Sequence, residues 1–252
     1  MNKIAVVTGG SRGIGLAITE KLLSDGYKVA ILHKDKETKL NREGVFEFIG
    51  DVSVLLDVNM FFYKVSQQWK DYELSLLVNN AGIASAKRFE SLSAKDFEAM
   101  FSVNVIGAFM MSKEFLKWCA LGDNKNIKSH IINISSVSGL QGFSGHAHYC
   151  ASKFALIGMG QVMAKELSKK GIAVNTICPG PTSDTDMWKQ LDKEYKENGF
   201  MPEESQEDDY SKKLLIKRMG SSEDIAKAVV WLAQQSYITG ISLPVCGGNI
   251  LR

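Results

Sequence analysis

Short apolar runs alternate along the whole chain with segments in which apolar residues recur at helical spacing. The first run, Ile4–Val7, precedes a segment of helical periodicity at 16–23. Later apolar runs lie at 28–34, 45–49, 76–78 and 131–136. Continuous apolar runs of strand length are typical of strands buried on both faces, as in parallel sheets connected by helices. The pattern therefore predicts an α/β fold, a parallel sheet with helices on both faces.

The length of 252 residues fits one α/β domain over 1–252 with a large buried core. The sequence shows no repeat, low-complexity tract or linker, and it contains only four prolines. Residues 34–44, between the second and third runs, are too few for a full helix, so we expect only a turn there.

Charge and cysteine content narrow the functional classes further. The formal net charge is +2, from 30 basic and 28 acidic residues, which gives no reason to expect nucleic acid or a membrane as partner. No segment approaches the length of a membrane span, and the N-terminus leads into a core strand rather than a signal peptide. The four cysteines are scattered, so we expect free thiols in the cytoplasm and no metal site.

A glycine-rich turn joins the first strand to the first helix. It contains Gly9, Gly13 and Gly15, together with Ser11, Arg12 and Ile14. In the order strand, glycine turn, helix, such glycines let the backbone approach a pyrophosphate, and the helix N-terminus directs free N–H groups at the anion. The turn therefore predicts a dinucleotide-binding loop.

Tyr149 and Lys153 are four residues apart, which places both side chains on one face of a helix. An ammonium held beside a phenol stabilises the phenolate, so we expect the pKa of Tyr149 to fall from about 10 toward neutrality. The pair is a candidate general acid and base for a carbonyl or an alcohol.

The end of the second strand indicates which dinucleotide binds. An acidic residue there would bind the ribose 2′-hydroxyl and select NAD, whereas this chain has His33 and Lys34, with Arg12 in the glycine turn. Cationic donors suit a 2′-phosphate, although Asp35 and Glu37 follow closely. We expect NADP rather than NAD.

With these motifs in place, the chain resembles the classical short-chain dehydrogenases/reductases over nearly its whole length. Further motifs of that family follow in order: Asp51-Val52, Asn79-Asn80-Ala81-Gly82, Asn104, Ser136, Pro179-Gly180 and a closing strand between Gly240 and Gly248. The resemblance implies a single-domain Rossmann fold, a doubly wound parallel sheet of about seven strands.

The resemblance also implies roles for these residues. Tyr149 would exchange the proton, Lys153 would lower its pKa and bind the nicotinamide ribose, and Ser136 would donate to the substrate oxygen. Asn104 would hold a water that links Lys153 to solvent. The cofactor-binding set would also include the residues of the later loops: Asp51, Val52, Asn80, Ala81, Gly82, Pro179, Gly180 and Thr182.

The segment 182–218 corresponds to a substrate lid in the family. It carries aromatic and apolar residues among charges, and an acidic run at 203–209. A lid with apolar anchors would exclude water from the reaction. A solvated loop without substrate contact is the alternative.

Several readings of the substrate stay open. The chain most resembles bacterial 3-oxoacyl-[acyl-carrier-protein] reductases of fatty acid biosynthesis, and Lys125, Lys128, Lys169 and Lys170 are candidates for docking an acidic carrier protein. The alternatives are a dehydrogenase of cyclic dihydrodiols such as 2,3-dihydro-2,3-dihydroxybenzoate, a reductase of small carbonyls or sugar alcohols, and a non-catalytic protein that senses NADP. The resemblance further implies a homotetramer or homodimer.

Overall fold

One parallel β-sheet forms the centre of the molecule in the computed structural model, which describes residues 3–36, 40, 42–202 and 210–251. Its strand order is β3-β2-β1-β4-β5-β6-β7, and every neighbouring pair is parallel. The strands are β1 (Lys3–Thr8), β2 (Lys28–His33), β3 (Val45–Ile49), β4 (Glu73–Asn79), β5 (Ser129–Ile134), β6 (Ile172–Pro179) and β7 (Ser242–Val245). The prediction of a doubly wound sheet of about seven strands is confirmed.

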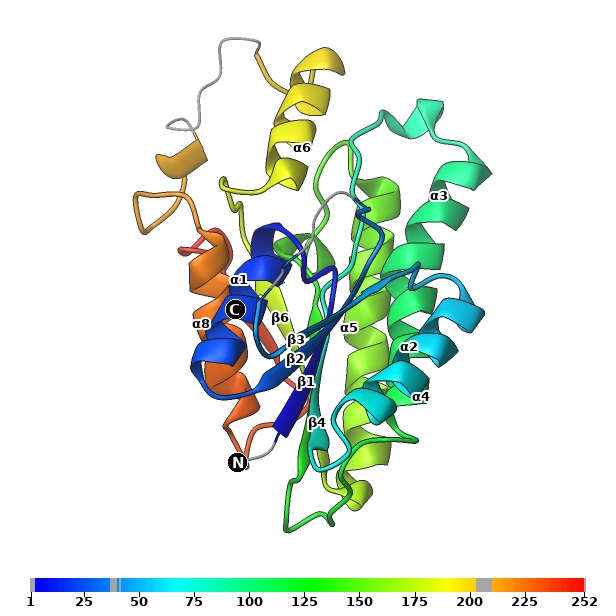
Figure 1. Ribbon diagram of the computed structural model, residues 1–252. Coiled ribbons are helices and arrows are strands. Elements are labelled where there is room, and N and C mark those ends of the chain that lie inside the picture. Colours follow the sequence, from blue (N-terminus) through cyan, green and yellow to red (C-terminus); the bar gives the residue numbers. More distant parts are fainter. Residues whose placement is uncertain (1–2, 37–39, 41, 203–209, 252) are drawn as a thin grey trace.

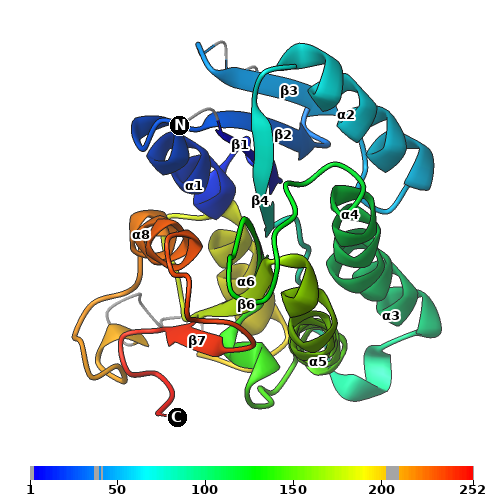
Figure 2. The same cartoon turned by 90° about the horizontal axis from the view of Figure 1, so that it is seen from below.

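Helices cover both faces of the sheet (Figures 1 and 2). Figure 2 shows α1 and α8 on one side of the strands and α2, α4 and α5 on the other. The α-helices are α1 (Gly13–Ser24), α2 (Leu55–Gln68), α3 (Ala94–Phe101), α4 (Ala108–Phe115), α5 (Ala147–Leu167), α6 (Asp186–Glu197) and α8 (Ser222–Ala233). Short 3₁₀ turns are η1 (Phe89–Ser91), η3 (Val137–Gly139) and η4 (Ser168–Lys170), and η2 (Ser102–Gly107) is a π-helix.

Alternation along the central strands divides the core into two layers. Ile4 and Val6 of β1 face α2, α4 and α5, while Ala5 and Val7 face α1 and α8. Because successive side chains of a strand point to opposite faces, a strand buried on both sides must be apolar at every position. This is the physical reason for the continuous apolar run that the sequence shows.

Polar residues define where two of the helices begin. Ser93 before α3 and Ser221 before α8 each form a capping box with an aspartate three residues later, Asp96 and Asp224 respectively. Between β2 and β3 the described residues form no helix, which agrees with the short crossover that the sequence predicts. Residues 37–39, including Glu37, lie outside the described residues.

The layer between β3 and α2 depends on Phe61. Its side chain is fully buried and its ring contacts those of Phe46, Phe48 and Phe62 at centroid distances of 6.5, 5.9 and 5.3 Å. We expect Phe61→Ala to lower the free energy of unfolding by about 3–5 kcal/mol, because it removes buried area and leaves a cavity. Chemical denaturation measures this change. Tyr63→Ala on the exposed face of the same helix is the control, and an equal loss in both variants would contradict this account.

Candidate active site

The expected site residues gather at the carboxyl ends of the central strands. The chain winds outward from β1 through β2 to β3, and then returns to build β4 to β7 on the other side of β1. The crevice between β1 and β4 is therefore the topological switch point, where open α/β sheets bind their ligands. Loops after β1, β4, β5 and β6 carry the expected catalytic and cofactor residues to this edge.

The glycine turn after β1 is bent so tightly that side chains are excluded. Gly9 and Gly13 have φ of +64° and +52°, in the left-handed region that favours glycine. A Cβ on Gly15 would lie 2.0 Å from the carbonyl oxygen of Gly9. Ser11 is buried in this turn, and Ile14 packs against the core layer beneath α1.

The turn is joined to the end of β4. The hydroxyl of Thr8 accepts hydrogen bonds from the backbone N–H groups of Asn80 and Ala81, both at 2.9 Å. In return, Nδ2 of Asn80 donates to the carbonyl oxygen of Thr8 at 2.9 Å. Asn80 and Ala81 thus fix the shape of the turn.

The N-terminus of α1 is suited to an anion. Arg12 at its cap makes no side-chain capping bond, and no acidic residue lies in the first turn of α1. The N–H groups of a helix start that lacks such a cap carry partial positive charge and are open to a phosphate. These features fit the pyrophosphate of a dinucleotide.

Three expected catalytic residues meet behind this turn. The Nζ atom of Lys153 donates to the carbonyl oxygen of Ile134 at 3.0 Å and lies 5.6 Å from the centre of the Tyr149 ring. Asn104 is close by, because a Cβ on Gly82 would lie 3.2 Å from its Oδ1 and 3.5 Å from Nζ of Lys153. The first turns of α5 and the π-helix η2 are thus brought together across the end of β4.

Asn104 is held firmly in η2. Its Oδ1 accepts from the N–H of Ile83 at 2.8 Å, and its Nδ2 donates to the carbonyl oxygen of Ile83 and to Oγ of Ser152, both at 3.0 Å. A π-turn within a helix is rare and occurs often at functional sites. The sequence motif located Asn104 on a helix but gave no sign of this irregular turn.

Ser136 lies at the other side of Tyr149, directly after β5. Its Oγ accepts from the N–H of Ser138 at 3.1 Å, so the hydroxyl proton remains available for another acceptor. Burial has the largest effect on the pKa of Tyr149 and raises it, while a hydrogen bond with Ser136 acts in the opposite direction.

Burial dominates the electrostatics of the pair, contrary to our expectation of a lowered tyrosine pKa. Tyr149 is only 7% exposed, and loss of hydration raises its pKa to about 12. The same loss lowers the pKa of Lys153 to about 8, although the thiol of Cys178 partly opposes that shift. Within the chain alone, therefore, the net shift of the Tyr149 pKa is upward, because burial outweighs the hydrogen bond with Ser136.

Among the residues expected to bind a 2′-phosphate as cations, His33 differs from the expectation. His33 is buried, and desolvation lowers its pKa despite the opposing effects of Glu47 and Asp35. A neutral, buried imidazole does not supply the positive charge we expected there. Lys34 is 68% exposed and its Nζ lies 2.7 Å from Oδ2 of Asp51, while Arg12 is exposed and lies 3.7 Å from Asp186.

The remaining expected cofactor residues lie around the same edge. Val52 is buried and packs against Gly107 of η2. Pro179 is the last residue of β6, and the N–H of Gly180 donates to the carbonyl oxygen of Val245 at 3.0 Å. The buried Thr182 donates its hydroxyl to the carbonyl oxygen of Gly180 at 3.1 Å.

Helix α6 covers Tyr149. Met187 and Leu191 on its inner face pack against Tyr149, Ala84 and Met100. Oε2 of Glu194 accepts from the N–H of Ala86 at 2.6 Å. The segment after α6 continues this contact, because a Cβ on Gly145 would lie 2.7 Å from the ring of Phe200. These contacts bury the phenol beneath the helix.

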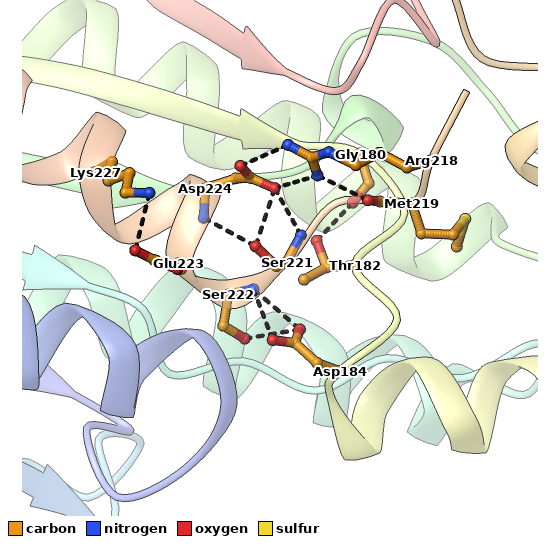
Figure 3. Close-up of polar contacts among 10 residues, drawn as sticks. All are labelled: Gly180, Thr182, Asp184, Arg218, Met219, Ser221, Ser222, Glu223, Asp224 and Lys227. Atoms are coloured by element: carbon orange, nitrogen blue, oxygen red, sulfur yellow. Dashed lines mark hydrogen bonds and ion pairs between the residues drawn. The ribbon is translucent and has the colours of Figure 1, made fainter. Parts of the chain in front are cut away.

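The two ends of the segment that carries α6 are fastened together (Figure 3). The N–H of Gly220 donates to the carbonyl oxygen of Pro181 at 2.9 Å, and the carboxylate of Asp184 accepts from the N–H and Oγ of Ser222 at 3.0 Å. Arg218 forms a bidentate ion pair with Asp224 at 2.7 and 2.9 Å. Residues 203–209, with the acidic run, lie outside the described residues.

Two histidines, His146 and His148, lie close to Tyr149 in the sequence. Both are buried at the start of α5. The ring of His146 meets those of Tyr149 and Tyr195 edge to face, at 5.3 and 5.0 Å between centroids. Only the fact that both precede Tyr149 by a few residues could have drawn attention to them.

The four lysines considered for carrier-protein docking lie at the end of the sheet opposite to the expected catalytic residues. Lys125 and Lys128 precede β5, and Lys169 and Lys170 precede β6. The backbone of Lys128 bonds to Gly171 at 2.8 Å, at the amino end of these strands. Because the sheet is parallel, the catalytic residues lie at the opposite, carboxyl end.

Among the described residues, no helix is long and apolar enough to cross a membrane. Within the same part of the chain, no cluster of three or more His, Cys, Asp or Glu side chains could hold a metal ion.

Comparison with known proteins bears on the family and the fold. The family model described as short chain dehydrogenase matches residues 3–196. The L-2,3-butanediol dehydrogenase of Corynebacterium glutamicum is 33% identical, and the alignment covers 99% of each chain. The 3-oxoacyl-[acyl-carrier-protein] reductase MabA of Mycobacterium tuberculosis is also 33% identical, over 98% of this chain and 93% of its own. A solved structure of a variant of the actinorhodin polyketide ketoreductase with NADPH is 27% identical, with a TM-score of 0.90 over 98% of this chain and 97% of that one.

Burial of His146 makes stability depend on pH. Desolvation and the neighbouring His148 lower the pKa of His146 from an ordinary 6.5 to about 4. Between these values the unfolded chain binds a proton that the folded chain does not, so the stability contribution present above pH 6.5 is lost as the pH falls toward 4. We expect the free energy of unfolding of His146→Phe to fall less steeply over this range than that of the native chain. Urea titrations at several pH values measure both slopes, and parallel slopes would contradict the burial of a neutral ring.

Proposed function

Because the chain belongs to the short-chain dehydrogenase family, we propose that it is an NADP-dependent oxidoreductase that interconverts a carbonyl group and a secondary alcohol. One observation carries this proposal: Tyr149, Lys153 and Ser136 meet at the carboxyl edge of the sheet, beside a glycine turn suited to a dinucleotide. Each of the three groups has a use in carbonyl reduction.

The residues present fit NADP. The start of α1 and the turn at Gly9–Gly15 would hold the pyrophosphate, and Asp51 and Val52 would lie beside the adenine. Lys34 and Arg12 are exposed cations that can turn toward a 2′-phosphate, each at present beside a carboxylate. Lys153 would bond the nicotinamide ribose, with Gly82, Pro179, Gly180 and Thr182 around the nicotinamide end. When bound, the cofactor would supply or accept the hydride.

The side chains of the chain itself would manage the proton and the charge. A phenol with a pKa of about 12 stays protonated near neutral pH, so Tyr149 can donate its proton to the oxygen of a carbonyl substrate. Lys153, still mostly an ammonium at neutral pH, would then stabilise the phenolate left behind. Ser136, whose hydroxyl lies beside Tyr149, would donate a hydrogen bond to the same substrate oxygen as negative charge grows on it. Asn104 would hold the water that returns a proton through Lys153.

We further propose that 182–218 acts as a lid. Met187 and Leu191 bury Tyr149, so water is excluded from the proton donor. The paired ends at Pro181–Ser222 would let α6 move while its base stays fixed.

Two substrate classes are candidates for the proposed reaction. Relatives at equal identity are named for 3-oxoacyl thioesters on a carrier protein and for butanediol. The first class is our leading sequence expectation, although the four lysines give it no support at this edge of the sheet. A non-catalytic NADP sensor would not need the full set of proton-handling residues.

We also propose that the chain forms a homo-oligomer. Ile106, Phe109, Phe154 and Val162 are about half exposed on η2, α4 and α5. Apolar side chains exposed on packed helices are typical of a subunit interface.

Tyr149→Phe tests the proton donor. The change removes only the hydroxyl, so we expect the kcat of NADPH-dependent reduction to fall by about a thousandfold or more. NADPH affinity, measured by fluorescence titration, should stay nearly the same. The substrates to test are an acetoacetyl thioester and small ketones, with absorbance of the reduced nicotinamide as the signal. Unchanged turnover would exclude the assignment.

Lys34→Ala and Arg12→Ala test the choice of cofactor. Loss of a charge-assisted contact to a 2′-phosphate should raise KM for NADPH about tenfold in each variant and leave KM for NADH unchanged. Lys21→Ala, a lysine on the far turn of α1, is the matched control. An equal effect on both cofactors would show that neither cation reads the phosphate.

A further inference from the structure

His146 occupies an unusual position beside the proton donor. It directly precedes α5, three residues before Tyr149, and its side chain is 6% exposed. Its ring packs edge to face against Tyr149 on one side and against Tyr195 of α6 on the other. The imidazole therefore lies in the wall of the site, between the catalytic phenol and the lid.

The hydrogen bonds of Tyr195 determine which nitrogen of His146 carries a proton. The Tyr195 oxygen lies 3.0 Å from the carbonyl oxygen of Ser144 and 3.2 Å from Nδ1 of His146. A carbonyl oxygen can only accept, so the single hydroxyl proton of Tyr195 points to Ser144. Nδ1 of His146 must then donate to the Tyr195 oxygen.

A neutral imidazole has one N–H, so Nε2 of His146 carries a lone pair. Burial keeps the ring neutral by lowering its pKa to about 4. Nε2 is itself buried and has no hydrogen-bond partner among the described residues. A buried acceptor without a donor is costly, and such a group in a native site calls for an explanation.

We propose that Nε2 of His146 accepts a hydrogen bond from a hydroxyl group of the substrate close to the reacting carbon. The site would then select hydroxy ketones and the corresponding vicinal diols. This inference rests on the proposed oxidoreductase function and names its substrate class. The hydroxyl would satisfy an acceptor that the folded chain leaves unpaired, and this gain is available only to a substrate with a donor.

The same lone pair disfavours a 3-oxoacyl thioester. Both carbonyl oxygens near its reacting carbon are acceptors, and neither can donate to Nε2. A site whose buried polar group requires a partner discriminates strongly against the analogue that lacks one. His146 therefore separates the two substrate classes that the relatives leave open.

The test compares 3-hydroxy-2-butanone with 2-butanone, which differ by one hydroxyl, using NADPH and three forms of the full chain. The native chain should have a kcat/KM higher for the hydroxy ketone by about a hundredfold. His146→Phe keeps an aromatic ring in the wall but removes the acceptor, so the ratio of the two kcat/KM values should fall by about tenfold or more. His130→Phe is the control, because His130 also has a buried ring nitrogen without a partner but lies near the amino end of β5, away from the site, and should leave the preference intact.

The outcomes separate this inference from the proposed function. Similar kcat/KM for both ketones in the native chain, or an equal loss for both in His146→Phe, would overturn the role of His146 while leaving the oxidoreductase in place. No reduction of either ketone or of the acetoacetyl thioester, despite NADPH binding, would instead overturn the function.

A second measurement does not depend on the variant. The ¹⁵N spectrum of the imidazoles should show His146 with a protonated Nδ1 and a bare Nε2, and 3-hydroxy-2-butanone should shift the Nε2 resonance while 2-butanone does not. A protonated Nε2 in the native chain would exclude the acceptor role.

Discussion

The parallel pairing of β1 with β4 is the constraint on which the site depends. These strands are far apart in the sequence, and the Thr8 hydroxyl joins their ends through the N–H groups of Asn80 and Ala81. This junction shapes the glycine turn on one side. On the other it places Gly82 between Asn104 and Lys153. The glycine turn and the residues proposed to handle the proton therefore share one rigid support, as precise positioning requires.

Burial then sets the protonation states of Tyr149 and Lys153. Desolvation raises the pKa of Tyr149 and lowers that of Lys153. The phenol of Tyr149 therefore keeps its proton near neutral pH. Such a state suits the donation of a proton to a carbonyl that accumulates charge. Helix α6 contributes to this state, because Met187 and Leu191 pack against Tyr149 and add to the burial that raises its pKa.

The contact between His146 and Tyr195 would connect the proposed lid to substrate selectivity. The hydroxyl of Tyr195 on α6 donates to a backbone carbonyl, and in our proposal it accepts a hydrogen bond from Nδ1 of His146, which leaves Nε2 as an acceptor. In our proposal, this contact would also determine which polar group of the substrate can bind. The orientation of the imidazole depends on residues of both α5 and α6.

The sequence by itself determined the sheet, its apolar strands, the glycine turn and the Tyr149–Lys153 pair, because periodicity, glycine conformation and helical spacing act over a few residues. It misjudged what depends on distant neighbours: the pKa of Tyr149, the buried neutral state of His33, and the end of the sheet at which Lys125 and Lys169 lie. It also gave no sign of the π-turn at Asn104 or of the partners of His146. Only the tertiary structure decided these, since burial and hydrogen-bond direction arise from residues that meet only when the chain is folded.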